Sequence, residues 1–354
     1  MTGRSLLRWV VGAVGALLVL VGAAAPAAAD PPRPTNYRST VTDVAPALPD
    51  GAEVRIIGGD SLLELSLPAG HTAVVADYAA TDDDDPVPYL RFRADGTVER
   101  NALAIATTAN ESRYGASDRV PDPDADPEWE TVATDGTYAW HDHRIHWMSP
   151  TAPRAVDDDG RVDLGGEDGT WSVPITIDDT PTVITGDLVL ESPPPAASTF
   201  ALLVGALVLA AAVVVIADRV GPRATGAVVT VIGLLALLTA WATWQAVPAD
   251  AGGSLVPVAV AAVAVVAGLL VVTGPAKVRL PALAAASASL LGWGILRFSV
   301  LTHTVLPTTL DPWIDRVATA AAIGVGAGIA VLLVRGPQRR PGPAAAVATA
   351  SPTA

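Results

Sequence analysis

The sequence predicts an all-β extracytoplasmic domain followed by an α-helical membrane domain of five transmembrane helices, and the charge distribution gives the first indication. Residues 31–195 carry 31 acidic and 11 basic residues, whereas residues 196–354 carry 4 acidic and 9 basic ones. Such asymmetry is typical of an acidic soluble domain joined to a membrane domain with basic loops. Short apolar runs punctuated by Gly, Pro and Asp fill the first half. Five long apolar runs fill the second.

The first 29 residues have the pattern of a secretory signal peptide. Arg4 and Arg8 precede an apolar stretch that ends in three alanines at 27–29. A basic segment, an apolar segment and an A-x-A site are its three parts, so we expect cleavage after Ala29. The alternative is an uncleaved membrane anchor. The chain has no cysteine, which excludes disulfides, thiolate metal sites and cysteine nucleophiles.

Residues 30–192 are predicted to form an acidic extracytoplasmic β-sandwich. The runs that favour strands are EVRIIGG, SLLELSL, TAVVADY, PYLRFRADGTVER, TYAWHDHRIHWM, TWSVPITI and TVITGDLVLES. The segments LRFRADGTVER and ITIDDTPTVITG are predicted to be hairpins. Asp95 and Gly96 supply the turn of the first, because glycine tolerates positive φ. No segment shows sustained helical periodicity. Seven or eight strands at this spacing favour an immunoglobulin-like antiparallel sandwich.

A Pro-rich linker at 193–197 leads into a five-helix transmembrane domain at 198–335. The five apolar runs lie at about 198–217, 224–246, 254–274, 280–301 and 316–334, each near the ~20 residues that span a bilayer. The tail at 336–354 is rich in Pro and Ala and has no aromatic residue, so we expect it to be disordered.

The loops between these runs predict the orientation. The loops at 218–223 and 275–279 and the tail contain Arg or Lys, whereas the loops at 247–253 and 302–315 contain neither. Basic loops stay in the cytoplasm. We therefore expect a multi-pass cell-membrane protein with its N-terminal domain outside and its C-terminus in the cytoplasm. Four tryptophans are then expected near the outer interface, where indole rings prefer to lie: Trp241, Trp244, Trp293 and Trp313.

Charge and motifs exclude several function classes. The net charge of −20 over residues 31–195 argues against a nucleic-acid partner, because phosphate backbones need Lys and Arg. No G-x-S-x-G, H-E-x-x-H or Gly-rich phosphate loop is present, so we expect no enzyme. Acidic runs at 82–85, 122–128 and 156–163 are interpreted as solvated loops. An EF-hand register around Gly160 places Ala155 and Gly166 at ligand positions, and neither offers a side-chain oxygen.

The stretch WHDHRIHWM at 140–148 is the strongest candidate site. It holds three of the five histidines, His141, His143 and His146, and Met148, the one methionine besides the initiator. Imidazole binds Cu, Zn or Ni well and thioether selects Cu(I), so the set suggests copper. A regular strand places His141 and His143 on one face and His146 and Met148 on the other. A three-histidine site therefore requires a bulge, a turn or a ligand from elsewhere.

Two other interpretations of this stretch stay open. Asp142 and Arg144 could form a structural ion pair while the rings fill the core, or the cluster could bind a ligand other than metal. Asp142 could also orient a histidine. His71 is the remaining histidine of this domain.

Arg297 and His303 are the candidates in the membrane domain. Charges inside a membrane are functional candidates by default, but Arg297 lies near the outer end of its helix and can snorkel. Pairing with Asp315 is the simpler interpretation, and an ion path is the alternative.

The chain also resembles a family of exported actinobacterial membrane proteins with an N-terminal β domain carrying a WHDHR-x-H-WM motif and C-terminal transmembrane helices. The matching pieces are TNYRSTV, RIIGGDSLLEL, PYLRFRADGTVERN, YAWHDHRIHWMSP and VPITIDDTPTVITGDLVL. The resemblance implies an architecture and no activity. A weaker likeness, in layout and His/Met content, is to secreted copper-handling β-sandwich domains joined to membrane helices.

Three functional hypotheses follow. The first is a cell-envelope integral membrane protein whose extracytoplasmic domain binds a ligand, copper being the candidate. The second is a membrane-anchored structural or interaction module without metal, with another envelope protein as partner. The third is a permease or metal-uptake helper that uses Arg297 and His303.

Overall fold

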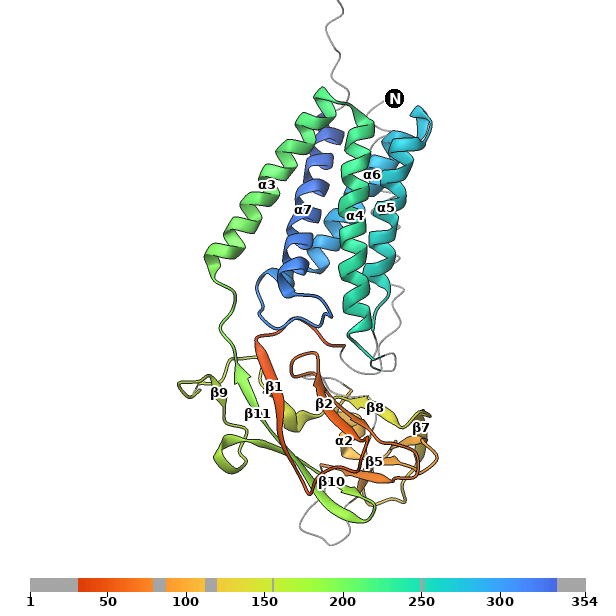
Figure 1. Cartoon of the computed structure of the whole chain (residues 1–354), viewed down its shortest axis with the longest axis vertical. Helices are drawn as coiled ribbons and strands as arrows, with labels where there is room; N and C mark the ends of the chain where they lie inside the picture. Colours follow the sequence, from red (N-terminus) through yellow and green to blue (C-terminus); the bar gives the residue numbers. More distant parts are fainter. Residues whose placement is uncertain are drawn as a thin grey trace, which may run out of the picture.

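The protein is described here by a computed structural model that covers residues 31–78, 87–111, 120–154, 156–248, 251 and 253–335. A β domain lies at one end of a bundle of five long helices (Figure 1). The predicted signal peptide, the acidic run at 82–85 and the predicted disordered tail lie outside the described residues.

The larger sheet of the β domain has eight strands, all in antiparallel pairs. Its main path runs β1-β11-β10-β4-β5-β6-β7, and β9 pairs with β11 beside this path. The strands are β1 (Tyr37–Ala45), β4 (Ala73–Ala76), β5 (Pro88–Phe92), β6 (Val98–Asn101), β7 (Trp129–Ala133), β9 (Arg161–Val162), β10 (Trp171–Ile177) and β11 (Thr180–Leu190). The two predicted hairpins are confirmed as β5–β6 and β10–β11.

The smaller sheet has three strands, β2 (Glu53–Ile57), β3 (Leu62–Ser66) and β8 (Thr137–Trp140), in the order β2-β3-β8. The prediction of an antiparallel β domain is confirmed. The immunoglobulin-like sandwich is not confirmed, because the strands divide into eight and three and not into the near-equal sheets of that fold.

The core of the β domain forms from alternating strand faces. On β10, Trp171, Val173, Ile175 and Ile177 are buried, whereas Ser172 and Pro174 are exposed. This is the period of two expected of a strand with one buried face. The same cluster takes in side chains of the smaller sheet, namely Leu63, Leu65 and Trp140. Strand β8 is therefore anchored in the core directly before the histidine-rich stretch.

Four elements of the β domain were not anticipated: strands β1, β7 and β9 and the short helix α2 (Ile105–Ala109). Strand β1 has one buried residue, Ser39, so it lacks the apolar alternation by which strands are recognised. Helix α2 is held by the buried carboxylate of Asp77, which accepts hydrogen bonds from the backbone N–H groups of Ile105 (2.8 Å) and Ala106 (2.6 Å).

The five predicted membrane helices are present. They are α3 (Ala196–Arg219), α4 (Pro222–Gln245), α5 (Val256–Thr273), α6 (Ala276–Leu296) and α7 (Pro312–Arg335), and all are long and apolar enough to cross a membrane. Helix α7 begins at Pro312 and not at 316. Asp315, expected in the loop at 302–315, therefore lies in the first turn of this helix.

Small residues allow α3 and α7 to pack closely. A Cβ atom added to Gly324 would lie 2.4 Å from the carbonyl oxygen of Ala206, and one added to Gly328 would lie 2.6 Å from that of Ala210. Close backbone approach at small residues is a common mode of helix association in membranes. The opposite face of α3 exposes large apolar side chains, including Phe200 and Leu207, as expected in contact with lipid.

The tryptophans of the bundle do not all lie at its surface. Trp241 and Trp313 are exposed, as expected for interfacial rings, but Trp293 is fully buried. Its indole lies inside the bundle beneath the guanidinium of Arg297, whose Cζ atom is 5.1 Å from the ring centroid. Trp293 therefore packs inside the bundle against a neighbouring cation, and its place at the level of the membrane interface stays a prediction.

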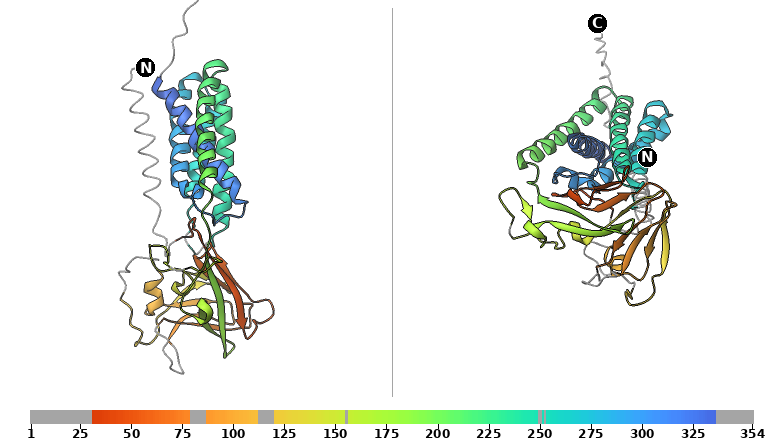
Figure 2. Two further views of the ribbon diagram at one scale, coloured as in Figure 1. Left: turned by 90° about the vertical axis from the view of Figure 1, so that its left-hand side faces the viewer. Right: turned by 60° about the horizontal axis from the view of Figure 1, so that its bottom comes forward.

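The β domain contacts one end of the helix bundle (Figure 2). Thr35 and Val305 form an isolated antiparallel bridge, with N–H to O distances of 3.0 and 2.9 Å. The side chain of Asn36 accepts a hydrogen bond from the N–H of Thr304 (3.0 Å). A small apolar cluster also spans the junction: Ile57, Leu62, Ala139, Val247 and Ala251.

Candidate metal centre

The histidine-rich stretch does not continue as a strand. Strand β8 ends at Trp140 and is followed by the 3₁₀ helix η1 (His143–Ile145). Asp142 caps this helix, and its side chain accepts a hydrogen bond from the backbone N–H of Arg144 (3.0 Å). Aspartate favours such local side-chain to backbone bonds at helix starts. This is the turn that a three-histidine site requires.

Asp142 is the centre of a buried polar network. It is fully buried and also accepts hydrogen bonds from Nε1 of Trp140 (2.8 Å) and from Nε and an Nη of Arg144 (2.8 and 2.7 Å). Burial alone would raise the pKa of Asp142, but the charge and hydrogen bonds of Arg144 hold that pKa below its usual value. The structural ion pair expected from the sequence is confirmed. Asp142 therefore holds the turn through these bonds.

Tyr78 ties this turn to β4. Its hydroxyl oxygen accepts a hydrogen bond from the backbone N–H of His143 (2.7 Å) and donates one to Oδ1 of Asn110 (2.6 Å). Its ring stacks on that of His143, with centroids 5.9 Å apart and planes at 21°. Burial, followed by the nearby charge of Asp142, raises the pKa of Tyr78 well above its usual value. The hydroxyl is thus a fixed neutral partner of the turn.

The turn brings His141, His143 and His146 together. One ring nitrogen from each lies within 4.8 Å of the other two. The ring centroids are 4.4 Å apart for His141 and His146, 5.3 Å for His141 and His143, and 5.5 Å for His143 and His146. His141 and His146 are buried, and His143 is half-buried. The three rings therefore form one compact cluster, called the histidine triad below.

A backbone carbonyl fixes the tautomer of His141. Nδ1 of His141 lies 3.0 Å from the carbonyl oxygen of Ser61. A carbonyl only accepts, so Nδ1 carries the proton and Nε2 of the neutral ring carries the lone pair. Metal-binding histidines are usually oriented by such a bond from the second ring nitrogen. Ser61 was not anticipated, because it lies 80 positions earlier in the chain.

Met148 is exposed, and His71 pairs with a carboxylate elsewhere in the domain. The side chain of Met148 is 41% exposed, so its role as a fourth ligand stays a prediction. Nδ1 of His71 lies 2.6 Å from Oδ2 of Asp178, and the pair is partly exposed. Its bond to His71 lowers the pKa of Asp178. Among the residues that the structure describes, the triad is the one group of three His, Cys, Asp or Glu side chains arranged to hold a metal.

The acidic stretch at 156–163 is only in part a solvated loop, because Arg161 and Val162 form strand β9 and Val162 is buried. In the loop at 156–163, Oδ1 of Asp157 accepts hydrogen bonds from the N–H groups of Asp159 (3.0 Å) and Arg161 (2.7 Å). Gly160 supplies a positive φ of 82°. The carboxylate is used to close the turn.

Arg297 and His303, the two candidates of the membrane domain, have different partners. Arg297 forms an ion pair with Asp315, as the simpler interpretation expected. His303 lies in the following loop, where its Nδ1 contacts the carbonyl oxygen of Ser299 (2.9 Å) and the hydroxyl of Thr302 (3.0 Å). Arg316 was not anticipated: its guanidinium donates to the carbonyl oxygens of Val300 (3.3 Å) and His303 (2.9 Å) and so holds this loop.

No family model, curated protein or solved structure matches this chain. The geometry of the site therefore carries the functional argument.

Proposed function

We propose that this chain is a membrane-anchored metal-binding protein whose histidine triad holds one transition-metal ion and binds copper in preference to other metals. The main support is that three imidazole nitrogens from one short turn lie within 4.8 Å of one another. Direct ligands of a tetrahedral ion at about 2.1 Å are about 3.4 Å apart, so each ring needs to move by less than about 1 Å.

The network around Asp142 supports this proposal. A metal site requires ligands held in place by surrounding bonds. Here Asp142 and Tyr78 fix the backbone of the turn, and the carbonyl of Ser61 orients His141.

The ligand set favours copper. Divalent copper binds nitrogen ligands more tightly than the neighbouring first-row ions do, and no thiolate is present to select another metal. Three protein ligands leave a fourth position open, as in sites that bind water or a substrate. If Met148 turns inward to fill it, the thioether favours Cu(I). A Met148→Leu variant separates the two cases, because it lowers Cu(I) affinity only if the sulfur binds.

We also propose that the β domain faces the outside of the cell and the C-terminus the cytoplasm, as in the exported actinobacterial family that the sequence resembles. The basic loops at 218–223 and 275–279 support this orientation. Reporter fusions before Ala196 test it. Cytoplasmic reporter activity there would overturn the orientation and leave the metal site itself untouched.

The decisive experiment is a calorimetric titration of the full-length protein in detergent with Cu(II), Zn(II) and Cu(I). We expect one ion per chain, with Cu(II) tighter than Zn(II). His143→Ala is the informative variant, because His143 is the least buried member of the triad. Its affinity should fall by more than about 100-fold, beyond the usual effect of losing a supporting residue.

The matched control is His71→Ala, which removes a histidine of the same domain that bonds to Asp178 instead. It should bind copper as the unchanged protein does. Equal binding by His143→Ala and the unchanged protein would contradict the proposal. Equal weakening by both variants would show nonspecific binding.

The alternative is a membrane-anchored structural or interaction module without metal, and the burial of His141, His146 and Asp142 favours it. In that case His141→Ala lowers the melting temperature by the same amount with and without metal. Under the metal proposal, added copper raises the melting temperature of the unchanged protein and not that of the variant.

A further inference from the structure

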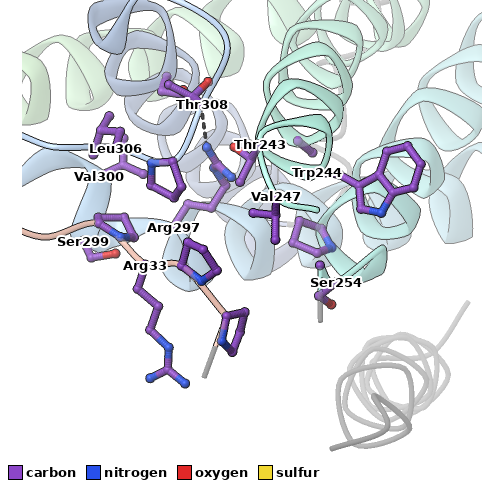
Figure 3. Close-up of a pocket in the computed structure, with 18 of the residues that line it drawn as sticks. Arg33, Thr243, Trp244, Val247, Ser254, Arg297, Ser299, Val300, Leu306 and Thr308 are labelled. Carbon is purple, nitrogen blue, oxygen red and sulfur yellow. Dashed lines mark hydrogen bonds and ion pairs between the residues drawn. The ribbon is translucent and has the colours of Figure 1, made fainter. Parts of the chain in front are cut away.

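A second candidate site lies in the bundle, at the end nearest the β domain. A cavity of about 400 Å³ opens there between the ends of α4, α5 and α6, with the extended segment 31–34 across it. Arg297 lies in this cavity beside Thr243, and Val247 and Ser254 lie on the neighbouring wall (Figure 3). Pockets of this size that combine apolar walls with a few polar groups are the usual binding sites for small molecules.

A buried ion pair forms the polar part of the cavity. An Nη atom of Arg297 lies 2.5 Å from Oδ1 of Asp315. The side chain of Asp315 is fully buried and that of Arg297 is 9% exposed. The guanidinium also rests on the ring of Trp293. The charges of Arg297 and Asp315 cancel, and the guanidinium of Arg33, which also lines the cavity, points away from this pair (Figure 3). The polar part of the site therefore favours a ligand that carries no net charge.

The pair leaves hydrogen-bonding capacity unused. Oδ2 of Asp315, Nε of Arg297 and Oγ1 of Thr243 are buried and have no hydrogen-bond partner among the residues that the structure describes. A buried unmatched polar atom costs roughly 1–3 kcal/mol, and more when charged. Oδ2 of Asp315 is a strong acceptor, and Nε of Arg297 on the paired side chain is a strong donor. A ligand that carries both a cationic N–H and an anionic oxygen satisfies both atoms.

One side of the cavity borders the outer surface of the helix bundle. Leu296 lines it and is 49% exposed on α6. Trp244 lines it as well and contacts the exposed Trp241, with ring centroids 4.7 Å apart. Tryptophans at helix ends mark the headgroup level of a membrane. A lipid headgroup can therefore approach from the side.

We propose that this cavity binds a phosphoethanolamine group, with its ammonium donating to Oδ2 of Asp315 and a phosphate oxygen accepting from Nε of Arg297. The zwitterion matches the neutral pair, and the position at the headgroup level favours a lipid over a free molecule as its source. The assignment is independent of the histidine triad, which belongs to the other domain.

The test uses the full-length protein in detergent and three probes: phosphatidylethanolamine, phosphatidylcholine and water-soluble phosphoethanolamine. Bound lipid is measured by native mass spectrometry and the melting temperature is followed. We expect retention and a higher melting temperature with phosphatidylethanolamine only, because the quaternary ammonium of phosphatidylcholine has no N–H to donate to Asp315. Equal effects of the two lipids, or no effect of either, would overturn the proposal. If water-soluble phosphoethanolamine raises the melting temperature and phosphatidylethanolamine does not, the site binds a soluble zwitterion and not a lipid.

Two variants assign the effect to the cavity. Thr243→Phe fills it and leaves the ion pair intact, so the response to phosphatidylethanolamine should vanish without loss of the fold. Thr273→Phe, at the exposed far end of α5, should respond normally. Asp315→Asn should weaken binding by about tenfold or more, the effect of losing a charged hydrogen bond. An unchanged response in Thr243→Phe would contradict the assignment.

Discussion

Asp142 is the residue that allows the three histidines to meet. Its carboxylate binds Trp140 on the preceding strand and Arg144 in the turn, so β8 ends and the chain folds back at this point. The neighbouring hydroxyl of Tyr78 holds the N–H of His143. The three histidines of the candidate site are therefore positioned by residues outside the triad.

The first prediction concerns this carboxylate. Asp142→Asn leaves Arg144 buried without its counter-charge, and breaking a buried pair costs about 3–5 kcal/mol. We expect a correspondingly lower free energy of unfolding of the β domain and a loss of metal affinity, measured by denaturant titration and calorimetry. Asp178→Asn changes an exposed carboxylate and should alter neither. A stable Asp142→Asn protein with full affinity would refute the role given to Asp142.

The site residues could be predicted from the sequence, but their supporting groups could not. Three histidines within six positions already indicate a ligand set, and strand alternation shows that a turn is needed to gather them. How the turn is held and how the His141 ring is oriented depend on Tyr78 and on the carbonyl of Ser61. These groups lie far from the cluster in sequence, and no local pattern connects them to it.

Helices and strands with a strong pattern of apolar residues were predicted from the sequence, and those without one were missed. The β10–β11 hairpin and the five apolar helices carry strong periodicity or length, and both were predicted. Strand β1 has little apolar periodicity, because only one of its side chains is buried. Its place beside β11 is fixed by pairing of residues as far apart as Tyr37 and Leu190, which no sequence window contains.

The second prediction concerns the contact of α3 with α7. Gly328→Val places side-chain atoms against the carbonyl of Ala210 and should push the helices apart. Overpacking of this kind costs about 1–3 kcal/mol, so the melting temperature of the detergent-solubilised protein should fall. Gly205→Val is the matched control on α3, because a Cβ atom there meets nothing within 4 Å. Equal melting temperatures for the two variants would contradict the packing described.

At the scale of the whole molecule, the charge division of the sequence corresponds to a physical division between an acidic β domain and an apolar bundle. The junction between them was not anticipated. The bridge between Thr35 and Val305 and the bond from Thr304 to Asn36 hold the two parts together through a loop of the bundle, held in turn by Arg316.

The third prediction tests this junction in a chain that has no cysteine of its own. Thr35→Cys combined with Val305→Cys should form a disulfide under mild oxidation, because residues paired in an antiparallel bridge lie within the Cα separation that a disulfide spans. The crosslink is detected as a shift in gel mobility that reductant reverses. Asp43→Cys combined with Val305→Cys is the control and should stay uncrosslinked. Failure of the first pair to react would show that the two parts do not meet in this way.

The central claim is that the histidine triad binds a metal ion, and electron paramagnetic resonance of the full-length protein loaded with one equivalent of Cu(II) tests it most directly. We predict a single copper species with hyperfine coupling to several imidazole nitrogens, which changes in His143→Ala and is unchanged in His71→Ala. A spectrum of free copper, or one that is the same in both variants, would contradict the claim.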